Sequence, residues 1–179
     1  MDLISKIDFS VLDFIQNYMR CGFLDAIFVF ITKLGDAGFI WIVLTIICLI
    51  TEKYRKLGSA MAVALVLCLV FGNGVLKEFF ARQRPFQISS LPLLITAPSG
   101  YSFPSGHTMS SFAAATSIYL THKKWGKWAY ILAGFIAFSR MYLYVHFLTD
   151  VLAGVVFGIL FGYLGAAIIY RKLSFRRRR

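Results

Sequence analysis

Long apolar runs separated by short polar segments dominate the chain. A membrane-spanning helix needs about 20 mostly apolar residues. Five runs approach that length: Phe39–Thr51, Gly58–Phe80, Thr108–Thr121, Trp128–Val145 and Leu148–Tyr170. The first and third are short, but flanking residues of low charge extend them. This pattern predicts an all-α integral membrane protein.

The N-terminal region is less regular. Residues 9–33 contain two apolar stretches, and Asp13, Arg20 and Asp25 interrupt them. Such a segment forms either one tilted span or an interfacial helix followed by a short span. We favour the span, so the sequence predicts one domain over residues 1–179, built as a bundle of six transmembrane helices.

Composition supports the membrane assignment. The chain is 59% hydrophobic and 15% charged, whereas soluble domains are about 45–50% apolar and about 25% charged. Most of the 19 Lys and Arg residues lie in three groups: Lys53, Arg55 and Lys56; Lys123, Lys124 and Lys127; and Arg171, Lys172 and Arg176–Arg179. Alternating spans put all three groups on one side, which the positive-inside rule makes cytoplasmic.

This orientation has three consequences. It predicts a multi-pass protein of the cell (plasma or inner) membrane with a cytoplasmic C-terminus. It places the long connection between residues 80 and 107 on the external face. It also explains the net charge of +11 as a signal of topology and of contact with anionic membrane lipids, so no nucleic-acid partner is predicted.

The remaining polar residues gather at the external ends of the apolar runs: Lys77, Arg82, Arg84, Arg140, His107, His146 and Asp150. One cation at such a place can simply reach the headgroups. Several together point instead to a functional cavity, because charge inside a membrane is costly.

Spacing separates these residues. Lys77 and Arg84 are seven apart, which is two helical turns, so both are expected on one helix face, with Pro85 ending the helix. Arg82 falls on another face and is the weaker candidate; a basic helix end remains an alternative for it.

His146 and Asp150 are four apart and are expected within hydrogen-bond reach if a helix begins just before His146. A carboxylate beside an imidazole fixes its tautomer and leaves a nucleophilic nitrogen.

The external connection contains "PSG" twice, in residues 97–108, "APSGYSFPSGHT". The first copy precedes Tyr101 and is interpreted as a turn. In the second copy, Ser105 is expected to cap a helix, and Gly106 lets the backbone approach an anion at the helix N-terminus. His107 titrates near neutrality. The second copy is therefore the predicted site, although both could be loop punctuation.

Three cations and helix-end donors suit a phosphate group that is being transferred. No cluster of carboxylates is present to hold magnesium or a pair of metal ions. We therefore predict a metal-free site without a cofactor, in which a histidine is the nucleophile.

These residues resemble the signature of the type 2 phosphatidic acid phosphatase family, membrane lipid phosphate phosphatases with a haloperoxidase-like core. The signature is Lys-x6-Arg-Pro, Pro-Ser-Gly-His and Ser-Arg-x5-His-x3-Asp, and here it reads Lys77–Pro85, Pro104–His107 and Ser139–Asp150. The resemblance implies phosphate binding by five residues: Lys77, Arg84, Arg140, Ser105 and the Gly106 backbone. It also implies that His146 forms a phosphohistidine, Asp150 orients it, and His107 protonates the leaving oxygen.

The short chain looks like the compact bacterial members of that family. These act on undecaprenyl diphosphate, phosphatidylglycerol phosphate or phosphatidic acid, and an external site favours the polyprenyl diphosphate. Two alternatives remain open: a lipid phosphotransferase with the same nucleophile, and a non-enzymatic phosphate-binding scaffold or transporter.

Glycines recur every four residues in the last run, at Gly154, Gly158 and Gly162. Faces without side chains allow close helix approach in membranes, so this face is expected to pack within the fold or in a homo-oligomer. Ordinary glycine enrichment of membrane helices is the alternative.

Overall fold

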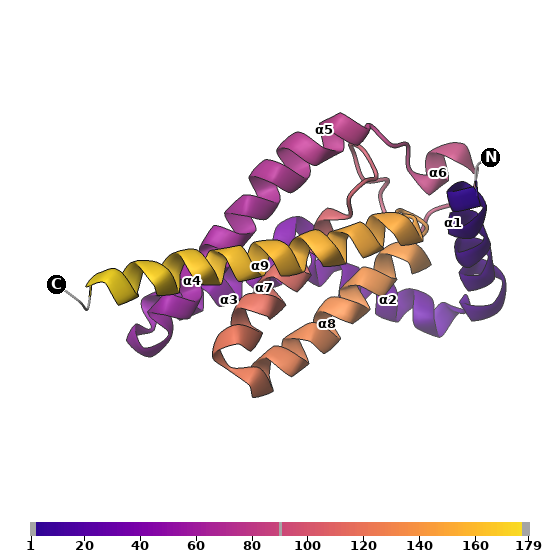
Figure 1. Cartoon of the computed structure of the whole chain (residues 1–179). Coiled ribbons are helices and arrows are strands. Elements are labelled where there is room, and N and C mark those ends of the chain that lie inside the picture. The colour runs from indigo at the N-terminus through magenta and orange to yellow at the C-terminus, as the bar shows by residue number, and fades with distance from the viewer. Residues whose placement is uncertain (1–2, 90, 177–179) are drawn as a thin grey trace.

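The computed structural model describes residues 3–89 and 91–176, without the side chains of 171–176. Throughout this part of the chain the regular elements are helices (Figure 1). The α-helices are α1 Leu3–Phe14, α2 Gly22–Leu34, α3 Phe39–Ile50, α4 Arg55–Leu67, α5 Lys77–Phe80, α6 Pro85–Ile88, α7 Gly106–Thr121, α8 Lys123–Tyr142 and α9 Leu148–Arg176. Short helical turns of other types link several of them: Ile15–Met19, Asp36–Gly38, Glu52–Tyr54 and Cys68–Leu76.

The all-helical prediction is confirmed, but the predicted count of six spans is not. Two helical stretches in the described residues are long and apolar enough to cross a membrane, Glu52–Ile88 and Leu148–Tyr170. Gly22–Leu34 and Asp36–Ile50 meet at 44° and provide a third if the bent pair crosses as one. The other helices are shorter or less apolar.

Helix α7 lies at the centre of the bundle and packs against α4, α8 and α9 (Figure 1). Its middle is built from small residues, and Ala113, Ala114 and Ala115 are fully buried. Because protein surrounds this helix, it does not need the uniform apolar surface of a helix that faces lipid. The ring Nε1 of Trp41 in α3 donates to the Ser111 hydroxyl of α7 at 2.8 Å.

The glycine face of α9 is packed inside the chain. A Cβ added at Gly158 would lie 2.5 Å from the Met109 carbonyl oxygen of α7, and one at Gly162 would lie 2.5 Å from that of Ala113. Gly154 is similarly close to Ser105. Close packing within the fold is therefore confirmed. A homo-oligomer stays a prediction, although α7 covers this face within the chain.

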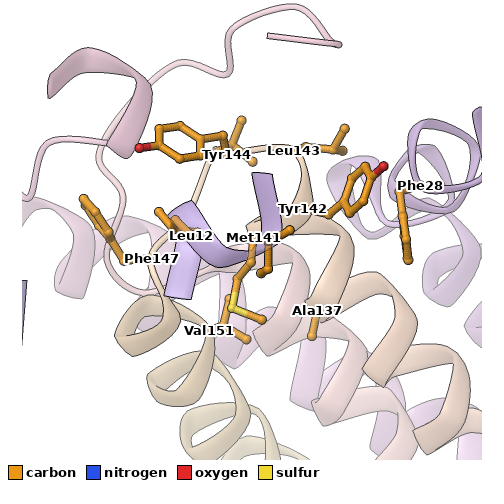
Figure 2. Packing of buried hydrophobic residues seen from close by; sticks show 11 residues of the cluster. Leu12, Phe28, Ala137, Met141, Tyr142, Leu143, Tyr144, Phe147 and Val151 are labelled. Atoms are coloured by element: carbon orange, nitrogen blue, oxygen red, sulfur yellow. The ribbon is translucent and has the colours of Figure 1, made fainter. Parts of the chain in front are cut away.

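A buried apolar cluster holds the turn that joins α8 to α9 (Figure 2). Leu12 of α1 and Phe147 of the turn are almost fully buried, and the Phe9 and Phe147 rings pack edge to face with centroids 5.1 Å apart. Tyr144 adopts a φ of 60°, a left-handed conformation that L-residues rarely adopt. The turn therefore has one defined shape, and it carries His146.

The long external connection begins where α5 ends. Ala81 has a φ of 41° and closes the helix at Phe80. The chain then runs without helical structure to Pro85, which is the first residue of α6. The expectation that one helix continues to Pro85 is wrong, because the left-handed residue at Ala81 turns the chain four residues earlier. Further along, Gly100 has a φ of +72°, so the first "PSG" is a turn, as predicted.

Candidate active site

All three signature segments meet at one end of the bundle, around a cavity of about 890 Å³. Six of the eight predicted site residues line it: Lys77, Arg84, Gly106, His107, Arg140 and His146. Ser105 and Asp150 are fully buried behind this lining. The sequence spacing therefore identified residues that the fold brings together.

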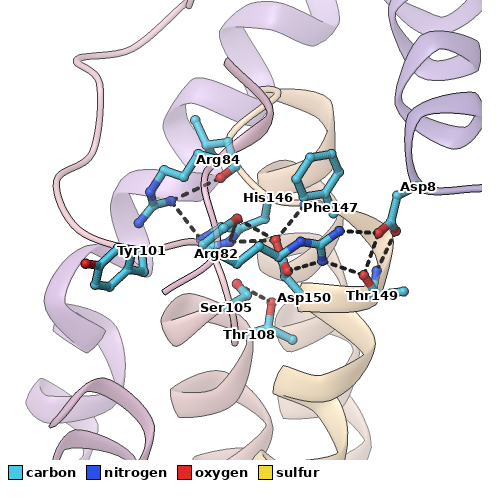
Figure 3. A network of polar contacts seen from close by, with 12 residues as sticks. Asp8, Arg82, Arg84, Tyr101, Ser105, Thr108, His146, Phe147, Thr149 and Asp150 are labelled. Atoms are coloured by element: carbon cyan, nitrogen blue, oxygen red, sulfur yellow. Dashed lines mark hydrogen bonds and ion pairs between the residues drawn. The ribbon is translucent and has the colours of Figure 1, made fainter. Parts of the chain in front are cut away.

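His146 and Asp150 form the expected pair, with His146 Nδ1 3.5 Å from Asp150 Oδ2 (Figure 3). Arg84 Nη1 lies 3.1 Å from the other ring nitrogen, Nε2. A guanidinium can only donate, so Nε2 carries the lone pair and the proton is on Nδ1, facing Asp150. The geometry thus selects the tautomer in which Nε2 has a free lone pair, as the predicted role of nucleophile requires.

The helix that carries this pair begins later than expected. α9 starts at Leu148, so His146 lies in the turn before it. Asp150 Oδ2 accepts a hydrogen bond from the Phe147 backbone N–H at 2.9 Å, as a carboxylate in the first turn of a helix commonly does. The Arg140 carbonyl accepts bonds from the backbone of Val145 and His146, which fixes the turn from its other side.

Burial also affects the titration of His146. The side chain is 2% exposed, and desolvation lowers the pKa of the imidazole below its ordinary value, although the Asp150 carboxylate opposes this shift. His146 is therefore neutral near pH 7, as an imidazole nucleophile must be.

Arg84 is held by backbone carbonyls of the first "PSG" turn. Its Nε donates to Gly100 at 2.9 Å, its Nη2 to Ser99 at 3.1 Å and its Nη1 to Val145 at 3.0 Å. The guanidinium is thus aimed at His146 before any substrate arrives. The first copy is a turn that organises the site.

Lys77 reaches the same turn, where Nζ donates to the Tyr101 carbonyl at 3.1 Å. Because α5 ends at Phe80, Lys77 and Arg84 do not share a helix face, and the helical-spacing reason given for grouping them is wrong. They meet because the chain folds back after Ala81. The Tyr101 ring takes no part in the polar network (Figure 3).

Arg140, in the last turn of α8, has unused hydrogen-bonding capacity. Its side chain is 2% exposed, and Nη1 donates to the Thr32 hydroxyl of α2. Its Nε has no hydrogen-bond partner among the described residues. A buried donor without a partner costs free energy, so its presence in the cavity lining points to an anion that binds there.

The second "PSG" begins α7 as predicted, but Ser105 does not cap the helix with its side chain. Its hydroxyl instead accepts a bond from Thr108 at 2.9 Å, and its backbone N–H donates to the Asp150 carbonyl at 3.0 Å. The capping prediction is wrong because a neighbouring hydroxyl takes the oxygen. Phosphate contact by Ser105 and by the Gly106 backbone stays a prediction.

Sequence reasoning missed or undervalued several residues. Arg82 is not a free basic helix end, because it forms ion pairs with Asp150 and Asp8. Ser102 donates to Asp150 Oδ2 at 2.5 Å, and Asp36 contacts His107 at 2.8 Å. Asp8 and Asp36 lie far from the signature in sequence, and no spacing rule connects them to it.

The donor set is poor in metal ligands. In the ranges that the structure describes, no three His, Cys, Asp or Glu side chains form a group that could hold a metal ion. The cavity instead presents two guanidinium groups, one ammonium group and two imidazoles, with a single carboxylate, that of Glu78, in its lining. Such a set binds phosphate through charge-assisted hydrogen bonds.

Comparisons with known proteins identify the family of the chain. The PAP2 superfamily model matches residues 53–174. An undecaprenyl-diphosphatase from Sulfolobus acidocaldarius is 34% identical over 155 residues, covering 85% of this chain and 74% of that protein. A phosphatidylglycerophosphatase B from Bacillus subtilis is 36% identical over 162 residues, covering 82% and 75%.

A solved structure is similar across nearly the whole chain. It is the crystal structure of a transmembrane PAP2 type phosphatidylglycerolphosphate phosphatase from Bacillus subtilis, with a TM-score of 0.76 and 28% identity, covering 96% of this chain and 88% of that one. The family model spans more than half of the chain and includes all three signature segments. The chain therefore belongs to the PAP2 superfamily of membrane proteins, as its sequence motifs predicted.

Proposed function

We propose that the chain is a metal-independent lipid phosphatase that forms a phosphohistidine on His146. One observation carries the proposal. His146 Nε2 lies on the Arg84 side of the imidazole, away from the Asp150 carboxylate that faces Nδ1. A phosphoryl group bound by Arg84 would lie directly in front of that nitrogen.

Three cations are available for this phosphoryl group. Arg84, Arg140 and Lys77 all line the cavity. Arg140 Nε has no hydrogen-bond partner among the described residues, so it can donate to a phosphate oxygen without breaking an existing bond. The Gly106 N–H, in the first turn of the 16-residue helix α7, is a further donor at a helix N-terminus. Together they stabilise the charge that develops on the equatorial oxygens.

The first chemical step transfers the phosphoryl group. His146 Nε2 forms a bond to phosphorus while the bond from phosphorus to the leaving oxygen breaks, and His107 donates a proton to that oxygen. Asp150 stabilises the positive charge that His146 gains, through the proton on Nδ1.

The second step regenerates the enzyme. A water attacks phosphorus and gives its proton to His107, which is neutral after the first step. The bond between phosphorus and Nε2 breaks, and inorganic phosphate leaves. Every proton that His107 gives in the first step is returned in the second.

The rest of the cavity suits a lipid chain. Beyond the cations its lining is mostly apolar and comes from α3, α4 and the segment Cys68–Leu76: Ile42, Thr45, Ile46, Ala62, Leu65, Val66, Cys68 and Leu69. A site with a polar end and an apolar extension fits an amphiphile whose phosphate enters first.

Our preferred substrate is undecaprenyl or another polyprenyl diphosphate, with glycerolipid phosphates such as phosphatidylglycerol phosphate and phosphatidic acid as the other members of the class. Three cations balance the high charge of a diphosphate, and one of the relatives is an undecaprenyl-diphosphatase. We further propose that the site opens on the external face of the cell membrane and that the C-terminus is cytoplasmic. Residues 177–179, part of the basic tail, lie outside the described residues.

The test is phosphate release by the purified chain in detergent. The panel contains a polyprenyl diphosphate, its monophosphate, phosphatidylglycerol phosphate and phosphatidic acid, each with and without EDTA. We expect hydrolysis that survives chelation, fastest with the diphosphate, and none with His146→Ala. Loss of activity in EDTA with recovery in magnesium would contradict the mechanism.

The same assay separates the alternatives. A phosphotransferase would give a phosphorylated acceptor when an alcohol is added, in place of most of the free phosphate. A scaffold or transporter would bind the lipids and release nothing. Either result would overturn the hydrolase proposal.

A further inference from the structure

We propose that Asp36, in the turn between α2 and α3, is a positioning residue for His107. It holds Nε2 of the imidazole so that Nδ1 exchanges the proton with the leaving oxygen and with water. This inference rests on the proposed role of His107 as the general acid, and it adds the residue and the nitrogen through which that role is exercised.

The contact itself is direct. His107 Nε2 lies 2.8 Å from Asp36 Oδ1. The other ring nitrogen, Nδ1, has no hydrogen-bond partner in the described part of the chain, although the His107 side chain lines the cavity. One nitrogen is therefore engaged by protein, and the other is left for the reaction.

The turn is shaped around the His107 ring. A Cβ added at Gly35 would lie 2.8 Å from His107 Cδ2, so only glycine leaves room for the ring at that position. Ala37 has a φ of 50° and Gly38 a φ of +74°. Alanine in the left-handed region is strained, and such strain concentrates at functional sites. The turn keeps this conformation while it presents Asp36 to His107.

Asp36 is the charged group near His107 that favours the protonated form of the imidazole. The charged groups that act on the imidazole are Asp36 of this turn, Arg140 of α8 and Lys77 of α5. Burial and the two cations lower the pKa of His107 below its ordinary value, to about 4, so the expectation that it titrates near neutrality does not hold for the chain without substrate. The bound phosphate needs both cations. Asp36 is the one carboxylate in this set, so it favours the imidazolium that a general acid requires.

The proton balance is complete with these groups. The imidazolium donates Nδ1–H to the leaving oxygen and becomes neutral, while Nε2–H remains bonded to Asp36. Nδ1 then holds a lone pair and accepts the proton of the attacking water. Without Asp36, the neutral imidazole could place its proton on Nδ1 and lose the ability to accept there.

Substitution of Asp36 tests the role through the leaving group. Asp36→Asn should lower kcat about 10-fold on the lipid substrate, part of the roughly 10²–10⁴-fold that general acid catalysis provides. The loss should be much smaller for phosphoenzyme formation from p-nitrophenyl phosphate, whose leaving group needs no proton. Glu52→Gln is the matched control, because Glu52 is exposed and begins the turn Glu52–Tyr54 as Asp36 begins its own. It should leave both rates unchanged.

Two further readouts exclude a purely structural role. Removing the carboxylate lowers the pKa of the His107 imidazolium, so the basic limb of the kcat profile on the lipid should move to lower pH in Asp36→Asn and back in Asp36→Glu. In a His107→Ala background, Asp36→Asn should cost nothing more. Equal losses on both substrates, an unmoved basic limb, or the same loss in both backgrounds would overturn the proposal.

The experiment also distinguishes failure of this inference from failure of the proposed function. If His107→Ala loses lipid turnover while Asp36→Asn equals the wild type, only the positioning role is wrong. If His107→Ala itself retains full lipid turnover, His107 is not the general acid, and the positioning role of Asp36 is wrong as well.

Discussion

Arg82, which is partly exposed, forms an ion pair with the fully buried Asp150, with Arg82 Nη1 2.7 Å from Asp150 Oδ1. The second nitrogen of the same guanidinium, Nη2, lies 2.6 Å from Oδ2 of Asp8 in α1. Asp8 is fully buried and also accepts bonds from the backbone and hydroxyl of Thr149 (Figure 3). The N-terminal helix is thereby connected to the carboxylate that orients His146.

Arg82→Ala should therefore affect both stability and activity. It leaves the buried carboxylates of Asp8 and Asp150 without their cation, a change that typically costs about 3–5 kcal/mol. We expect a large fall in the thermal unfolding temperature in detergent and a lower kcat. Arg20→Ala is the control, because Arg20 meets Asp25 at 3.8 Å in a partly exposed pair worth at most about 1 kcal/mol. Equal stability of the two variants would show that the Arg82 network is dispensable.

Two glycine-to-alanine substitutions should change the stability of the chain in opposite directions. Alanine usually stabilises a helix by up to about 1 kcal/mol relative to glycine. Gly134→Ala in α8 should follow that rule, because an added Cβ meets nothing within 4 Å. Gly158→Ala should destabilise the chain, because its Cβ would lie 2.5 Å from the Met109 carbonyl oxygen. Thermal unfolding in detergent compares them, and a stabilised Gly158→Ala would contradict the packing of α9 on α7.

The titration of His146 gives a third prediction. Because burial lowers the pKa of His146, the ring should remain neutral as the pH falls from about 7.5 to about 5.5, whereas an ordinary histidine becomes protonated near 6.5. Nuclear magnetic resonance of imidazole-labelled protein measures this directly, since the chain has three histidines and His146→Asn identifies the signal. A midpoint at or above 6.5 would contradict the lowered pKa of His146, the proposed nucleophile.

The sequence was informative about which residues form the site and less so about how they meet. Lys77, Arg84, His107, Arg140 and His146 were selected by charge in an apolar context and by spacing, and all five line the cavity. Charge inside a membrane is costly wherever it occurs in the chain, so this signal does not depend on knowing the fold.

Local geometry was harder to predict, because tertiary contacts override local rules. The helix was expected to reach Pro85, yet Ala81 adopts a left-handed conformation and ends it at Phe80. Ser105 occupies a capping position, yet its hydroxyl bonds Thr108. The supporting carboxylates Asp8 and Asp36 could not be found, because only the folded chain brings α1 and the α2–α3 turn to the signature residues.

The phosphoenzyme is the most direct test of the central claim, that His146 is the nucleophile. The chain is mixed with ³²P-labelled p-nitrophenyl phosphate, whose leaving group needs no proton from His107, quenched within the first turnover, and separated from free label. His107→Ala should retain a label on protein that is stable to alkali and released by acid, since the bond to nitrogen forms and its hydrolysis lacks a base. His146→Ala should retain none. A labelled His146→Ala protein, or an acid-stable label in any variant, would contradict the account.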